Sequence, residues 1–207
     1  MPPIDSDSEH ELHTAWERGD YDRVATVFMQ CFGSDVLAFL CDRLGNATDA
    51  DEAFSVFAED LWRGLPGFRW RATLRGWAFT LARNAANRLR RDPRRRRENN
   101  QPLPESSNFA QAVAEARTRT PAHRRSDVKS RLRELRSELP EEYQTLLVLR
   151  IDQGLSWPEL ASVLSGLGDA LDDAARERWA VRLRQRFKRV KDGLRARAVA
   201  EGLLNEA

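Results

Sequence analysis

The stretch TDADEAFSVFAEDLW, residues 48–62, decides the kind of secondary structure that surrounds it. Its apolar residues recur at spacings of three and four, the period of an amphipathic α-helix, at Ala53, Phe54, Phe57 and Leu61. Thr48 followed by Asp51 has the spacing of a capping box, so we expect the helix to begin there. Gly and Pro in residues 64–67 are expected to end it.

The same periodicity extends outward in both directions, and no segment has the alternation of a strand. Towards the N-terminus it predicts helices over residues 11–18, 20–32 and 36–44, with a bend at Gly33 and Ser34. Towards the C-terminus it predicts helices from Thr73, from Pro140, from Ser156 and from Asp172, the last of them long enough to bend at Gly193. The sequence therefore predicts an all-α fold.

Composition divides the chain into two small helical domains and a linker. Residues 92–127 contain four prolines and a run of arginines at 94–97, which is typical of a flexible basic linker, with one transient helix near residues 109–116. We therefore expect domains at residues 1–91 and 128–207.

Several classes of protein are excluded by composition. No uninterrupted apolar stretch approaches the roughly 20 residues of a membrane-spanning helix, and the acidic N-terminus is unlike a secretory signal. We therefore expect no membrane insertion and a cytoplasmic protein. Two cysteines and three histidines without zinc spacing argue against a disulfide framework or a metal site, and no cofactor is expected.

The net charge of +2 conceals an uneven distribution. Residues 1–60 hold fourteen Asp or Glu against three Arg, a net charge of −11, so the remainder carries +13. An acidic N-terminal part and a basic remainder of the chain indicate two different partners, one of them a polyanion.

The last predicted helix has the character of a DNA-recognition helix. Residues 174–197 contain ten basic and two acidic residues, a charge of +8, while Trp179, Leu183, Phe187, Val190 and Leu194 form an apolar stripe that can dock on its own domain. A helix, a Gly-containing turn and a second helix are the plan of a helix-turn-helix motif. The candidate base and phosphate contacts, chosen because Arg and Gln read base edges, are Arg182, Arg184, Gln185, Arg186, Lys188 and Arg189.

Aromatic and basic residues alternate where the predicted helix from Thr73 begins. Rings can hold bases that have left the stack while guanidinium groups hold the backbone, which favours binding of single-stranded DNA. Trp70 is the stacking candidate, whereas Trp77 falls on the inward face. The candidate residues before the helix are Arg69, Trp70 and Arg71. The candidate residues on the helix, which are expected to point outward, are Arg75, Thr80, Arg83, Asn84, Asn87 and Arg88.

In this order the two modules resemble the sigma-70 family of bacterial transcription initiation factors, in the compact extracytoplasmic-function group that has only regions 2 and 4. The similarity to region 2 lies in DADEAF at 49–54, Trp62, FR at 68–69, LR at 74–75, Trp77 and ARN at 82–84. The similarity to region 4 lies in LPEEY at 139–143, GLSWPELA at 154–161 and LRQRFKRV at 183–190.

The resemblance implies binding to the RNA polymerase core, at the beta-prime clamp helices and the beta flap, and to promoter DNA. It assigns the polymerase contact to Asp49, Asp51, Glu52, Glu59, Asp60 and Trp62. It assigns the aromatic and basic candidates to the minus-10 element as a single strand and the last helix to the minus-35 element as duplex. It also implies that the protein is not an enzyme, and since the chain ends by Ala207, that a separate anti-sigma factor holds it inactive.

The chain departs from the family pattern in the second module. Nineteen positions separate Leu164 from Leu183 where the family has a tight turn. The extra residues, within 165–180, either lengthen the recognition helix at its front or add a helical turn beside it.

Two other functions fit parts of the sequence. A stand-alone helix-turn-helix regulator would need only the second module. A metal-dependent helical hydrolase would use Asp49, Asp51, Glu52, Glu59 and Asp60 as ligands.

Overall fold

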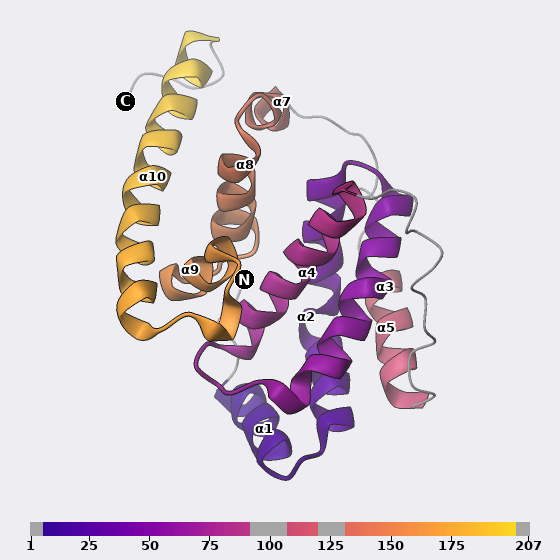
Figure 1. Ribbon diagram of the computed structural model, residues 1–207. Coiled ribbons are helices and arrows are strands. Elements are labelled where there is room, and N and C mark those ends of the chain that lie inside the picture. The colour runs from indigo at the N-terminus through magenta and orange to yellow at the C-terminus, as the bar shows by residue number, and fades with distance from the viewer. Residues whose placement is uncertain (1–5, 92–106, 120–130, 202–207) are drawn as a thin grey trace.

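The fold is all-α, as the periodicity predicts. The computed structural model describes residues 6–91, 107–119 and 131–201, and within these ranges every regular element is helical and there is no strand (Figure 1). The arginine run at 94–97 and the rest of the expected linker outside residues 107–119 lie beyond the described residues.

The N-terminal module consists of α1 (Ser6–Glu17), α2 (Tyr21–Leu44), α3 (Ala47–Gly64), the short 3-10 turn η1 (Leu65–Gly67) and α4 (Leu74–Arg91). Its core is rich in phenylalanine, because the apolar stripes of α2, α3 and α4 face one another. The fully buried rings are those of Phe28, Phe39, Phe54, Phe57 and Phe79.

Helix α2 is continuous, so the predicted bend at Gly33 and Ser34 is wrong. Gly33 is required for packing instead: a Cβ built on it would lie 2.6 Å from the Cβ of Ala116 in α5 (Ser107–Arg119). The continuous helix is long enough and apolar enough to cross a membrane, and an 18-residue stretch within it has a mean hydropathy of 1.7. This length was not apparent from the sequence analysis, which divided the helix at Gly33. However, 78% of this apolar stretch is buried inside the protein, as in the core helix of a folded domain.

Helix ends follow side-chain caps, and the predicted helix starts at Asp20, Thr73 and Ser156 are confirmed. Asp20 caps α2 by accepting from the Arg23 amide at 3.1 Å, and the Thr73 hydroxyl accepts from the Gly76 amide at 3.0 Å at the start of α4. The predicted cap of α3 is wrong, since Asn46 rather than Thr48 accepts from the Asp49 amide, at 2.7 Å.

Helix α5 lies within the segment predicted as linker, and it is packed against α2 (Figure 1). Phe109, Ala112, Val113 and Ala116 are all buried in this contact. This helix is therefore part of the core of the N-terminal module rather than transient.

The C-terminal module consists of α7 (Arg131–Ser137), α8 (Glu141–Leu147), the π-helical turn η3 (Val148–Asp152), α9 (Trp157–Ser165), the 3-10 turn η4 (Gly168–Ala170) and α10 (Asp173–Ala200). Ser156 and Glu159 form a capping box at α9. The extra residues after Leu164 do both things that the sequence allowed, since η4 adds a turn and α10 begins at Asp173. Helix α10 runs through Gly193 without a break.

The two modules are packed together in this structure. In Figure 1, α9 lies beside α4, and α8 and α10 continue away from the N-terminal helices. Leu155, Leu160, Val163 and Leu171 belong to the same apolar cluster as the core of the N-terminal module.

Candidate functional site

The acidic surface of α3 carries the residues that the resemblance assigns to polymerase. Its carboxylates at positions 49, 51, 52, 59 and 60 are all partly exposed. Trp62 is also only partly exposed, because its ring packs on Phe109 of α5 with centroids 5.2 Å apart. Arg117 of α5 donates to the Ser55 hydroxyl at 2.7 Å, so α5 borders this surface along its length.

Two carboxylates of this surface have distinct environments. Burial raises the pKa of Glu59, although Arg63 lies 4.0 Å away and acts in the opposite direction. Asp60 forms an ion pair with Arg88 of α4. The structure thus joins a residue expected to bind polymerase to one expected to bind DNA, and both line an open hollow with Asn84.

The loop between η1 and α4, residues 68–73, is shaped by Trp70. Trp70 has a positive φ of 54°, and its ring packs between Phe68 and the side chains of His13 and Trp16. The ring is therefore partly buried rather than free to stack on a base. Its indole Nε1 has no protein partner among the described residues.

The backbone amides of this loop converge on one carboxylate. Asp169 of η4 accepts from the Arg69 amide at 2.8 Å, from the Arg71 amide at 2.7 Å and from the Ala72 amide at 3.1 Å. A left-handed residue within such a loop turns successive N–H groups towards one anion. The side chains of Arg69 and Arg71 remain exposed beside it.

The predicted outward placement on α4 is wrong for Arg75 and Thr80. Arg75 is only 7% exposed, lies against the rings of Phe32 and Phe79, and donates to the Gln153 carbonyl. Thr80 is 3% exposed and donates to the Gly76 carbonyl at 2.9 Å. Both are buried because the C-terminal module covers this part of α4.

The next residues of α4 are also engaged. Arg83 is half-buried and donates to the Val163 carbonyl at 3.4 Å. Burial lowers the pKa of its guanidinium, while Glu141 and Glu142 act in the opposite direction. Asn87 accepts from Arg43 at 2.7 Å.

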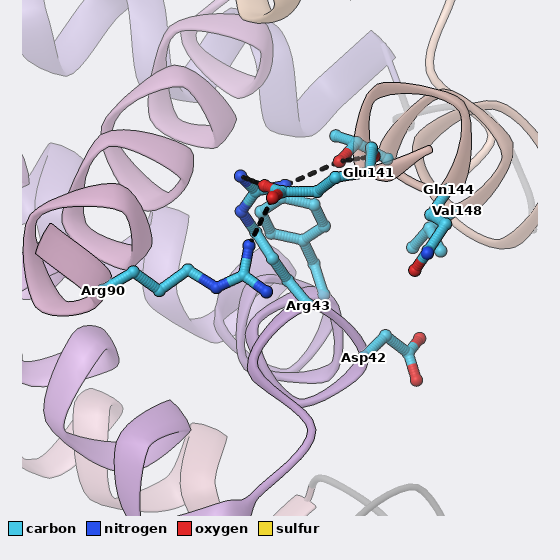
Figure 2. Close-up of a pocket in the computed structure, with 8 residues that line it drawn as sticks. Asp42, Arg43, Arg90, Glu141, Gln144 and Val148 are labelled. Atoms are coloured by element: carbon cyan, nitrogen blue, oxygen red, sulfur yellow. Dashed lines mark hydrogen bonds and ion pairs between the residues drawn. The ribbon is translucent and has the colours of Figure 1, made fainter. Parts of the chain in front are cut away.

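Arg43 is a functional candidate that the sequence analysis missed. Figure 2 shows Arg43 and Arg90 reaching the carboxylate of Glu141 from the N-terminal module. Arg43 also donates to the Thr145 hydroxyl at 2.6 Å, and burial lowers the pKa of its guanidinium despite the opposing effect of Glu141. A lone arginine near the end of a long apolar helix was the available signal.

The apolar stripe of α10 is turned towards the protein, as predicted, and most of the basic candidates on this helix are exposed. Leu183 and Val190 are buried, with Trp179 and Phe187 partly buried beside them. The exposed candidates are Arg182, Arg184, Gln185, Lys188 and Arg189. Two candidates have partners: Arg186 pairs with Glu142 at 3.1 Å and lies over the Tyr143 ring, and Arg184 pairs with Glu177 at 3.5 Å and lies over the Trp157 ring.

The structure does not bring the three predicted sets into one site. They form an acidic surface on α3, a largely covered surface on the loop and α4, and an exposed basic surface on α10. Among the described residues, no three His, Cys, Asp or Glu side chains are grouped so that they could hold a metal ion.

Comparison with known families gives a match in the N-terminal module. Residues 28–97 match the family model of sigma-70 region 2, which covers 70 of the 207 residues and includes α3, α4 and most of α2. The match supports a sigma-70 family member with a role in transcription initiation. Sigma factors as a family bind the RNA polymerase core and promoter DNA and are not enzymes. No curated protein and no solved structure matches the chain significantly.

Proposed function

We propose that this chain is a bacterial sigma factor of the extracytoplasmic-function type, which binds core RNA polymerase and directs it to promoters. The observation that carries the proposal is the region 2 match over a module whose acidic and basic surfaces lie on different helices. As a partner of polymerase it would act in the cytoplasm, held inactive by an anti-sigma factor.

The polymerase contact is assigned to the acidic surface of α3. Its partly exposed carboxylates offer a surface complementary to a basic partner, and Trp62 at its end offers an aromatic anchor of the kind enriched at interfaces. The beta-prime clamp helices are the proposed partner, with the beta flap contacting the C-terminal module.

The DNA contacts are assigned to two separate surfaces. The loop at 68–73 and α4 would hold the minus-10 element as a single strand, and α9 and α10 would form the helix-turn-helix unit that reads the minus-35 element. The exposed arginines of α10 support this role, because phosphate and guanine contacts both need accessible guanidinium groups. Residues 1–91 together with α5, and residues 128–207, would thus be two domains with separate DNA targets.

The direct test is binding to bacterial core RNA polymerase. The full chain should co-elute with core polymerase and be displaced by a housekeeping sigma factor. Failure of the folded protein to bind at low salt would favour a stand-alone helix-turn-helix regulator instead.

A charge-reversal variant tests which surface is used. D51K/E52K should abolish binding to polymerase while the protein stays folded by circular dichroism. E11K/E17K makes the same change of charge at exposed positions of α1, outside the surfaces assigned to polymerase, and should bind normally. Normal binding by D51K/E52K would exclude α3 as the interface.

A further inference from the structure

We propose that the C-terminal module holds this protein in a self-inhibited, closed form, in which the Asp169 carboxylate occupies the place of a phosphate of single-stranded DNA on the 68–73 loop. The inference rests on the proposed function in one respect, that the ligand displacing Asp169 is DNA.

The contact has the chemistry of anion recognition. Three backbone N–H groups surround one carboxylate at 2.7 to 3.1 Å, from a residue 97 to 100 positions further along the chain. A phosphodiester offers the same pair of anionic oxygens to such a concave loop. The exposed side chains of Arg69 and Arg71 flank the loop, where a strand would place its neighbouring phosphates.

Closure covers the surface that the minus-10 strand needs. Arg75 and Thr80 are buried, and Arg83 donates to a carbonyl of α9. Gly168 packs directly on α4, since a Cβ there would lie 3.2 Å from Trp77 and 3.4 Å from Thr80. No strand can reach Arg75 or Thr80 until the C-terminal module moves away from α4.

The residues that make this contact belong to the segment where the chain departs from the family pattern. Asp169 lies in η4, which occupies the extra length between Leu164 and Leu183. The added turn therefore has a defined place, on the DNA-binding loop of the other module.

The closed contact is also suited to opening. Within the described part of the chain, the side-chain amide of Gln153 is buried without a hydrogen-bond partner, as are the Nε atoms of Arg75 and Arg83. Buried polar groups without partners oppose the stability of a contact. Exchange of Asp169 for a phosphate, with separation of the modules, would release these groups to water.

The test measures DNA binding by the full chain without polymerase. A fluorescein-labelled 12-nucleotide single strand of mixed sequence is titrated by fluorescence anisotropy at fixed low salt with wild type, D169N, D169A and E115Q. We expect D169A and D169N to bind about fivefold more tightly or better, because the open form that binds the strand is no longer a minor part of the population. E115Q makes the same change of charge at an exposed residue of α5, away from the proposed DNA-binding surfaces, and should bind like wild type.

Hydrogen exchange of the 68–73 loop provides a second readout. The loop amides should exchange faster in D169A than in wild type, and the single strand should restore their protection. Equal binding by D169A and E115Q, or faster exchange that DNA does not reverse, would overturn the proposal. Polymerase binding is measured on the same proteins. Absence of polymerase binding by the wild type would contradict the proposed function, whereas unchanged DNA binding by D169A would contradict only this inference.

Discussion

The guanidinium of Arg43, near the end of α2, forms an ion pair with the carboxylate of Glu141, the first residue of α8 and 98 positions further along the chain. The Arg43 side chain is 5% exposed, whereas that of Glu141 is 52% exposed. The pair therefore joins a buried cation of one module to a surface anion of the other, and it lies at the opposite end of α4 from the Asp169 contact.

Removing the anion of this pair should destabilise the protein. Glu141→Gln leaves the buried Arg43 without its counterion and should lower the free energy of unfolding by about 1–2 kcal/mol, less than for a fully buried pair. Arg90→Gln removes the other ion pair of Glu141, from a side chain that is 44% exposed, and should cost less than about 1 kcal/mol. Urea unfolding measures both, and equal effects would contradict a special role for Arg43.

A methyl group at Gly33 should disturb the contact between α2 and α5. Gly33→Ala places a Cβ against Ala116 and should lower the free energy of unfolding by about 1–3 kcal/mol. Gly193→Ala is the matched control in α10, where nothing lies within 4 Å, and should raise it by about 0.5–1 kcal/mol. Thermal unfolding should also show that G33A/A116G recovers part of the loss, and the absence of any recovery would argue against the clash.

Glu59 should make stability depend on pH in a defined direction. Because burial raises its pKa above the ordinary value of 4.5, the folded protein binds this proton more readily than the unfolded chain. Its contribution to stability is therefore most favourable below pH 4.5 and is lost as the pH rises through the folded pKa. The stability of Glu59→Gln relative to wild type should increase from pH 4 to pH 7.

Two further proteins test this assignment. Arg63→Gln removes a cation that opposes the shift and should make the pH dependence steeper. An E59Q protein with the pH dependence of wild type would show that another group titrates. If Glu59 also contacts polymerase, E59Q should bind polymerase more weakly while being more stable at pH 7.

The exposed cations of α10 should control salt-dependent binding to duplex DNA. In R182A/K188A/R189A the slope of log K against log salt should fall by about 0.9 for each side chain that neutralises a phosphate. Arg186→Ala should change the slope less, because Arg186 already pairs with Glu142 at 3.1 Å. Anisotropy with a 20-base-pair duplex measures the slope, and an unchanged slope in the triple variant would reject this helix as the DNA-binding surface.

Local patterns predicted most of the secondary structure. The caps at Asp20 and Ser156 and the apolar stripe of α10 are all readable within one helix, since the apolar period and the cap are set by neighbouring residues. Gly33 was misread because a glycine that permits close helix packing looks the same in the sequence as one that permits a bend. The burial of Trp62 was equally hidden, since Phe109 lies in a segment whose composition suggested a linker.

The sequence by itself determined that the chain is helical and where its acidic and basic segments lie, because periodicity and charge are properties of short stretches. Only the tertiary structure decided which charges are exposed and which are enclosed. The partners of Arg75, Arg83 and Asp169 lie about 80 to 100 positions away in the sequence, and no local pattern specifies such a pairing. Packing of α9 and η4 on α4 brings these residues to their partners and produces the proposed closed form of the protein.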